Sequence, residues 1–178
     1  LQDAQNYYKK VLKMDPDFAA AHSNLGVVYK ILGKHQKAKD CYEKAIEINP
    51  GFADAHSNLG NLFEVLGKNQ IAKDCYEKAI EINPGFADAH SNLGNLLKKL
   101  GKNQKAKDCY EKTIEINPGF ADAHNNLGAI FGDLGEYPKA KKCFEKAIEL
   151  NPNYAIAYNN LGVIFKDLGE HQKAKDCY

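Results

Sequence analysis

A fixed period of 34 residues constrains the fold of this chain more than any other feature of its sequence. Residues 53–86 and 87–120 are identical at 29 of 34 positions and differ only at 63/97, 64/98, 65/99, 71/105 and 79/113. The same frame gives full units at 19–52 and 121–154, a truncated unit at 155–178 and, at residues 1–18, the second half of a further unit. Such a period is typical of solenoids, whose units bury their apolar faces against one another.

Each unit reads as two amphipathic helices, as the unit at 19–52 illustrates. Apolar residues recur at helical spacing in its first half (Ala21, Leu25, Val28, Tyr29, Leu32) and in its second half (Ala38, Tyr42, Ala45, Ile46, Ile48). Gly33 marks the end of the first helix, because glycine is favoured just past a helix C-terminus. Pro50 ends the second, because proline cannot continue a helix. One pair cannot bury its own apolar stripe, so we expect stacked pairs around a shared core.

The unit resembles the tetratricopeptide repeat, whose 34 residues carry W-x-x-L-G-x-x-Y, then A-x-x-x-F, then P. The matching residues of the unit at 19–52 are Leu25, Gly26, Tyr29, Ala38, Tyr42 and Pro50. The resemblance covers the whole chain and implies a single all-α, right-handed superhelical solenoid of helix-turn-helix repeats over residues 1–178. The signature Trp is replaced at His22, His56, His90, His124 and Tyr158. We interpret these residues as smaller aromatic fillers between the paired helices.

Charge and hydropathy argue against several classes of partner. The formal net charge is +1, and all 24 basic residues are Lys. The chain therefore has no arginine to bind phosphates or guanine edges bidentately. No apolar run approaches the roughly 20 residues that span a bilayer, and the first ten residues lack the layout of a signal peptide. We expect neither a nucleic-acid nor a membrane partner.

The stretch GFADAHSNLG, at 51–60 and again at 85–94, places Asp54, His56 and Ser57 close together, as if in a nucleophilic triad. Residues one or two apart on a helix do not face each other, so these three cannot form the triad geometry. In the third copy Asn125 replaces the serine. We expect a chain that is not an enzyme and has no cofactor, with Ser57 only at the front of a groove.

Five cysteines recur every 34 residues, at Cys41, Cys75, Cys109, Cys143 and Cys177. Equivalent residues of stacked helix pairs lie roughly 10 Å apart, which is too far for a disulfide with its limit of about 7 Å between Cα atoms. The same spacing argues against a shared zinc ion. Free thiols predict a reducing, cytoplasmic compartment. The charged runs of the second helix are expected on the solvated outer face, with Asp40 and Lys44 paired.

One polar column is not explained by packing, because an asparagine precedes Leu-Gly in every first helix: Asn24, Asn58, Asn92, Asn126 and Asn160. Asparagine is a mediocre helix former, and the adjacent buried leucine turns it away from the contact between paired helices. The run FADAHSNL also resembles the repeat region of O-GlcNAc transferases, which implies an asparagine ladder that holds an extended peptide. A carboxamide can pair with a backbone N–H and C=O together. Rungs about 10 Å apart match about three residues of extended chain.

The neighbours of the asparagine column vary along the chain and would provide selectivity. Four residues before it stand Ala20, Asp54, Asp88, Asp122 and Ile156, and three after it stand Val27, Asn61, Asn95, Ala129 and Val163. We predict peptide-binding roles for the acidic and amide members of this set, Asp54, Asp88, Asp122, Asn61 and Asn95, with a preference for hydroxyl-bearing or basic side chains. The alternative for the aspartates is that they only stabilise the helix start through the helix dipole.

Three functions fit the sequence. The first is a non-catalytic scaffold that binds an extended peptide or partner protein in a concave groove. The second is a substrate-recruiting segment of a larger glycosyltransferase-like enzyme, since the sequence begins and ends within a second helix and lacks an initiator methionine. The third is end-to-end self-association through uncapped termini, because solenoids normally need polar caps.

Overall fold

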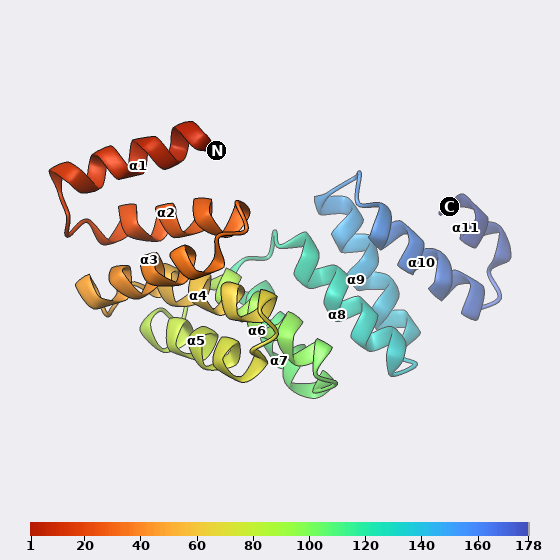
Figure 1. Cartoon of the computed structure of the whole chain (residues 1–178). Coiled ribbons are helices and arrows are strands. Elements are labelled where there is room, and N and C mark those ends of the chain that lie inside the picture. Colours follow the sequence, from red (N-terminus) through yellow and green to blue (C-terminus); the bar gives the residue numbers. More distant parts are fainter. Residues whose placement is uncertain (178) are drawn as a thin grey trace. The chain divides into compact units, whose positions relative to one another are not determined.

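The computed structural model describes residues 1–177, which form eleven α-helices and no strand (Figure 1). The helices are α1 Gln2–Met14, α2 Ala19–Ile31, α3 His35–Ile48, α4 Ala53–Val65, α5 Asn69–Ile82, α6 Ala87–Lys99, α7 Asn103–Ile116, α8 Ala121–Asp133, α9 Tyr137–Leu150, α10 Ala155–Asp167 and α11 His171–Asp176. The predicted all-helical fold of 34-residue helix-turn-helix repeats is confirmed. None of the described helices is both long and apolar enough to cross a bilayer.

The chain divides into two compact units, one at Leu1–Leu96 and one that begins at Leu97. The first unit contains α1 to α5 and most of α6, and the second contains the end of α6 and α7 to α11. Each unit is described by itself. The continuity of all the repeats in one solenoid stays a prediction.

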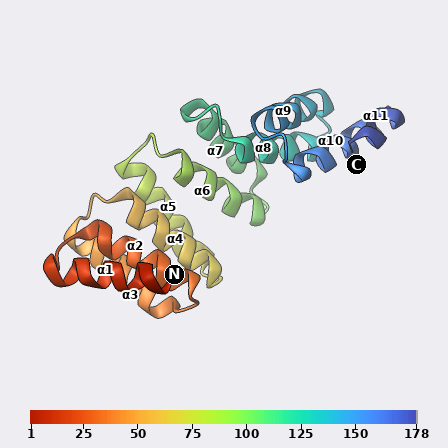
Figure 2. The same ribbon diagram turned by 90° about the horizontal axis from the view of Figure 1, so that it is seen from above.

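Within each unit the two helices of a repeat pack against each other and against the next repeat. In the first unit α2 pairs with α3, α4 pairs with α5, and α3 contacts α4 (Figure 2). In the second unit α8 pairs with α9, and α10 contacts α9, α11 and α8. First helices of consecutive repeats also meet directly, α2 with α4 and α8 with α10. The asparagine column lies on these first helices, so its members are brought close by that direct contact.

A glycine in the first helix lets the aromatic ring of the second helix approach its backbone. These rings are among the largest fully buried side chains, and Tyr76 is 0% exposed. A Cβ atom added to the glycine would lie 2.6 to 2.8 Å from the ring in the pairs Gly26–Tyr42, Gly60–Tyr76 and Gly128–Phe144. That distance is shorter than a van der Waals contact, so the sequence Leu-Gly is required by the packing of the repeat.

The turns follow from glycine, asparagine and histidine residues. Gly33 adopts φ +69° just past the end of α2, a conformation that glycine adopts without steric cost. After α3, Asn49 Oδ1 accepts a hydrogen bond of 3.1 Å from the Gly51 N–H. His56 Nε2 then lies 3.1 Å from the Pro50 carbonyl oxygen. Equivalent bonds of 2.8 to 3.0 Å hold His22, His90 and His124. The histidine rings therefore fasten the turn between repeats in addition to filling space.

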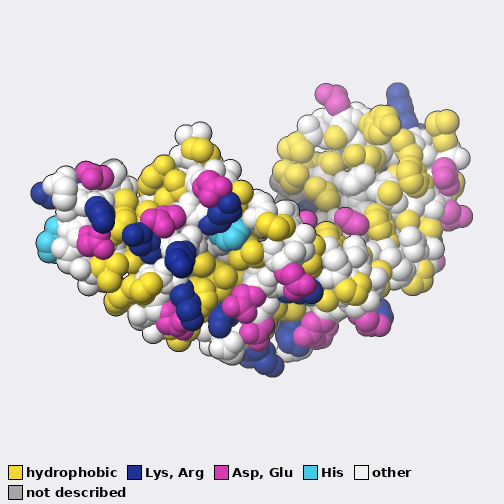
Figure 3. Space-filling view, turned by 180° about the vertical axis from the view of Figure 1, so that it is seen from behind, with side chains coloured by type: hydrophobic (Ala, Val, Ile, Leu, Met, Phe, Trp, Pro, Cys, Tyr) yellow, Lys and Arg dark blue, Asp and Glu magenta, His cyan; other side chains and the backbone are white. Residues whose placement is uncertain are grey.

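The second helices carry the predicted charged runs but not the predicted ion pair. Asp40 accepts a hydrogen bond of 2.7 Å from Gln36, and Lys44 pairs with Glu47 at 3.0 Å. The expected Asp40–Lys44 pair is therefore wrong, because each residue has a partner on the other side of its own turn. On the face shown in Figure 3, basic and acidic side chains are interspersed. Exposed pairs of this kind contribute about 0–1 kcal/mol each.

Candidate functional site

The asparagine column lies at the boundary between the core and the surface. Each asparagine is the sixth residue of its helix, on α2, α4, α6, α8 or α10. Asn24 is exposed and the four others, Asn58, Asn92, Asn126 and Asn160, are half-buried. The leucine that follows each of them is buried, with 5 to 7% of its surface exposed. The structure thus turns the amides away from the pair contact, as the sequence predicts. Asn24, Asn58 and Asn92 belong to the first unit, and the other two belong to the second.

Two of these amides bind the preceding repeat directly. Asn58 Nδ2 donates to Ser23 Oγ at 3.3 Å, and Asn160 Nδ2 donates to Asn125 Oδ1 at 3.0 Å. The acceptor is in both cases the residue just before the previous asparagine of the column. These bonds fix the orientation of the two amides and use one N–H of each. The carbonyl oxygens of Asn58 and Asn160 have no partner in the part of the chain that the structure describes.

The serine before the asparagine is a buried residue, which corrects the prediction for Ser57. Ser23, Ser57, Ser91 and Asn125 are only 2 to 4% exposed. They lie between the first helices of adjacent repeats, where Ser23 and Asn125 act as acceptors. Ser57 therefore does not front a groove. The sequence did not reveal this because helical spacing alone does not locate the contact between consecutive first helices.

The amides three residues after the column are engaged by the protein itself. Asn61 Oδ1 accepts a hydrogen bond of 2.8 Å from Tyr76 Oη, which also donates to Glu64 at 3.1 Å. Burial, followed by the charge of Glu64, raises the pKa of Tyr76 well above its usual range. Asn95, the equivalent residue of α6, is exposed. Asn61 is thus part of a polar network between α4 and α5, which its predicted peptide role did not include.

The three aspartates of the predicted site lie in the first turns of their helices and are exposed: Asp54 on α4, Asp88 on α6 and Asp122 on α8. That position agrees with a favourable interaction with the helix dipole. Asp122 also accepts a hydrogen bond of 2.5 Å from Tyr154 Oη of the next repeat. Burial and this bond raise the pKa of Tyr154 above its usual range. The structure therefore gives Asp122 a second structural role.

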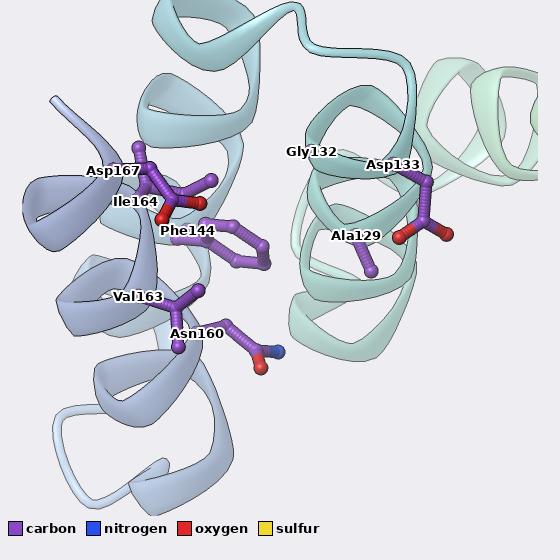
Figure 4. Close-up of a pocket in the computed structure, with 8 residues that line it drawn as sticks. All are labelled: Ala129, Gly132, Asp133, Phe144, Asn160, Val163, Ile164 and Asp167. Carbon is purple, nitrogen blue, oxygen red and sulfur yellow. The ribbon is translucent and has the colours of Figure 1, made fainter.

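A pocket of about 200 Å³ opens between α8 and α10 of the second unit. Its lining includes Asn160 of the column and two residues three positions after the column, Ala129 and Val163. The ring of Phe144 lies between the two helices, and the Asn160 amide points toward the space beside it (Figure 4). The pocket places a member of the asparagine column next to an apolar cavity.

Sequence reasoning missed three residues of this pocket: Gly132, Asp133 and Asp167. Asp133 and Asp167 are the last residues of α8 and α10. Both lie seven positions after an asparagine of the column, two helical turns along the same face. Extending the comparison of columns from three to seven positions would have found them.

The cysteines are half-buried free thiols within residues 1–177. Burial, with a smaller contribution from a nearby carboxylate, raises the pKa of Cys41, Cys75 and Cys143 to about 11. These thiols stay protonated at neutral pH and are poor nucleophiles. No group of three or more metal-ligating side chains occurs in the described part of the chain.

Comparison with known proteins gives one family. Its sequence model, described as tetratricopeptide repeat, matches residues 19–52, 53–86, 87–120 and 121–154, and a second model of the same description matches 143–176. A search of curated protein sequences gives no match.

Many solved structures resemble this chain. MamA is 25% identical with a TM-score of 0.76, and the match covers 86% of this chain and 90% of MamA. YrrB, described as a TPR protein with an unusual peptide-binding site, is 25% identical with a TM-score of 0.74 and coverages of 96% and 88%. PilF of Pseudomonas aeruginosa is 26% identical with a TM-score of 0.84 and coverages of 90% and 73%.

Proposed function

The chain belongs to the tetratricopeptide repeat family, and from that premise we propose that its asparagine column binds an extended peptide of a partner protein. Repeats of this family form scaffolds of the kind that mediates protein–protein interaction. The proposal adds where the partner binds and by which atoms. It describes a chain that recognises polypeptide backbone and performs no chemistry on it.

The observation that carries the proposal is the orientation of the column amides. Asn58 and Asn160 each use one N–H to bind the preceding repeat. Each amide keeps a carbonyl oxygen that can accept from a peptide N–H, and a second N–H that can donate to a peptide C=O. An amide held in place before binding loses less conformational freedom when the ligand arrives.

Backbone recognition explains why the same residue recurs while its surroundings change. Backbone N–H and C=O groups are present at every residue of any peptide. A rung spacing of about 10 Å matches about three residues of extended chain, each about 3.3 Å long. The similarity to YrrB, whose description includes a peptide-binding site, supports a peptide ligand for a fold of this kind.

The proposal is tested with a displayed library of random 12-residue peptides, from which binders are selected and measured by fluorescence anisotropy. Replacing Asn58 or Asn160 by alanine is expected to weaken binding by about tenfold per rung, the equivalent of about 1.4 kcal/mol. Asn159→Ala is the matched control, because Asn159 is an exposed asparagine directly beside Asn160 and outside the column.

Backbone contacts are tested separately on the selected peptide. Methylation of single backbone nitrogens should abolish binding at about every third position, whereas alanine substitution of the same residues should cost much less. A library without any binder, or binders whose affinity is the same for the Asn58→Ala, Asn160→Ala and Asn159→Ala variants, would overturn the proposal.

A further inference from the structure

We propose that the pocket between α8 and α10 is a side-chain subsite that accepts one basic residue, Lys or Arg, of the bound peptide. The proposal rests on the proposed function, because the peptide backbone is held beside the pocket by Asn160. It adds a position-specific preference to a column that by itself recognises backbone only.

The pocket exists because three positions that are filled in an earlier repeat are trimmed here. In the repeat at 53–86, Tyr76 Oη is covered by Asn61 and Glu64, with which it forms hydrogen bonds of 2.8 and 3.1 Å. In the repeat at 121–154 the equivalent residues are Phe144, Ala129 and Gly132. The hydroxyl, the amide and the carboxylate are thus removed together, and the space that they would fill is the cavity.

The bottom of the cavity is apolar. Phe144 and Ile164 are 2% and 4% exposed, and Ala129 and Val163 complete the apolar lining. A volume of about 200 Å³ is below the roughly 300–1,000 Å³ of sites for drug-sized ligands. It suits one side chain of a longer ligand. The methylene stem of Lys or Arg can cover apolar surface while its charged group stays at the rim.

The charged rim determines which side chain fits. Asp133 and Asp167 line the pocket, and no basic residue does. Neither carboxylate has a hydrogen-bond or ion-pair partner among residues 1–177. Each is the last residue of its helix, where the negative end of the helix dipole disfavours an anion. Two unpaired carboxylates and two helix C-termini therefore meet at one rim, and a cationic group relieves this accumulation of negative charge.

The peptide library of the preceding section provides the first test. Selected binders should carry Lys or Arg at one fixed position, and replacing that residue by norleucine, which keeps most of the stem without the charge, should weaken binding at least fivefold. The double variant Asp133→Asn/Asp167→Asn should lose this difference. The control variant Asp108→Asn should retain it, because Asp108 is an exposed acid of α7 that is bound to Gln104.

A second variant rebuilds the filled repeat. Ala129→Asn/Gly132→Glu/Phe144→Tyr copies the residues of the repeat at 53–86, where they coexist in a well-packed pair. This variant should fold and should retain the backbone contacts of Asn160, but the Lys-over-norleucine preference should disappear. Binders that show no fixed basic position, or a preference unchanged in either multiple variant, overturn the subsite and leave the asparagine column as proposed.

A small probe tests the pocket without the column. N-acetyl-lysine methylamide, titrated into the protein, should shift the methyl NMR signals of Ala129, Val163 and Ile164, and N-acetyl-norleucine methylamide should shift them at least fivefold less at equal concentration. The Asp133→Asn/Asp167→Asn variant should remove the difference. Equal shifts by both probes, or no shift by either, would count against the subsite.

Discussion

Tyr76 Oη lies 2.8 Å from Asn61 Oδ1 and donates a hydrogen bond to it. Tyr42, at the equivalent position of the preceding repeat, is also fully buried, but its hydroxyl oxygen has no partner within the described residues. Val27 stands where the repeat at 53–86 has Asn61. The same side chain therefore has a satisfied hydroxyl in one repeat and an unsatisfied hydroxyl in the next.

The two tyrosines should respond oppositely to loss of the hydroxyl. Tyr76→Phe removes a hydrogen bond to Asn61 and is expected to lower the free energy of unfolding by about 0.5–1.5 kcal/mol. Tyr42→Phe removes a buried polar group without a partner and should raise it, by up to about 1 kcal/mol. Urea denaturation followed by circular dichroism measures both changes. Equal destabilisation by the two variants would contradict the assigned network.

Gly60 should not tolerate a methyl group. Its added Cβ would lie 2.7 Å from Tyr76, and overpacking of this kind is expected to cost about 1–3 kcal/mol. Gly51→Ala is the matched control, because its nearest neighbour would be 3.5 Å away and its φ is not positive. Urea midpoints for the two variants check the prediction: Gly60→Ala should unfold at clearly lower urea than the native chain, and Gly51→Ala should not.

Residues that belong to the packing of a single repeat could be predicted from the sequence. Ala38, Tyr42 and Ala45 are buried as their spacing predicts, and Gly33 ends α2 as a positive-φ glycine. These features depend on helical periodicity and on backbone conformation, which the local sequence determines. The repeated frame then gives the same result in every unit.

Residues at the contact between repeats were predicted less well. Ser57 is buried because consecutive first helices meet directly, and Asp122 binds Tyr154 of the next repeat. Such contacts depend on how one repeat packs on another, which periodicity within a repeat does not specify. The pocket beside Asn160 was missed for the same reason, since it forms only where three positions from two helices are small together.

The buried thiols should react slowly and only at high pH. A pKa of about 11 for Cys75, against roughly 8.5 for a free thiol, leaves a thiolate fraction at pH 8 that is smaller by more than 100-fold. A variant that retains only Cys75 should therefore react with Ellman's reagent about two orders of magnitude more slowly when folded than when unfolded in urea. Comparable rates in the two states would contradict the burial of this thiol.

The same thiols make the fold less stable in alkali. Their pKa is raised in the folded state, so the unfolded chain releases its thiol protons first and binds fewer protons as the pH rises above about 8.5. The stability associated with Cys41, Cys75 and Cys143 is present below that pH and is lost progressively as the pH rises toward 11, the value of their folded pKa. Melting temperatures across pH 8 to 11 should fall, and replacing the three cysteines by alanine should make the decline shallower.

Asp122 and Asp54 occupy the same position of their repeats but should differ in their effect on stability. Asp122 accepts a hydrogen bond from Tyr154, whereas the aromatic residue that follows Asp54 by 32 positions is Phe86, which has no hydroxyl. Both substitutions remove an acid from a helix start, which costs a few tenths of a kcal/mol. Asp122→Ala should cost about 0.5–1.5 kcal/mol more, because it also leaves Tyr154 Oη without its acceptor. Tyr154→Phe should reduce that additional cost to near zero in a double-mutant cycle, measured by urea denaturation. A coupling energy near zero between positions 122 and 154 would show that this bond contributes nothing to stability, and the exposed carboxylate of Asp122 would then be as available to a bound peptide as that of Asp54.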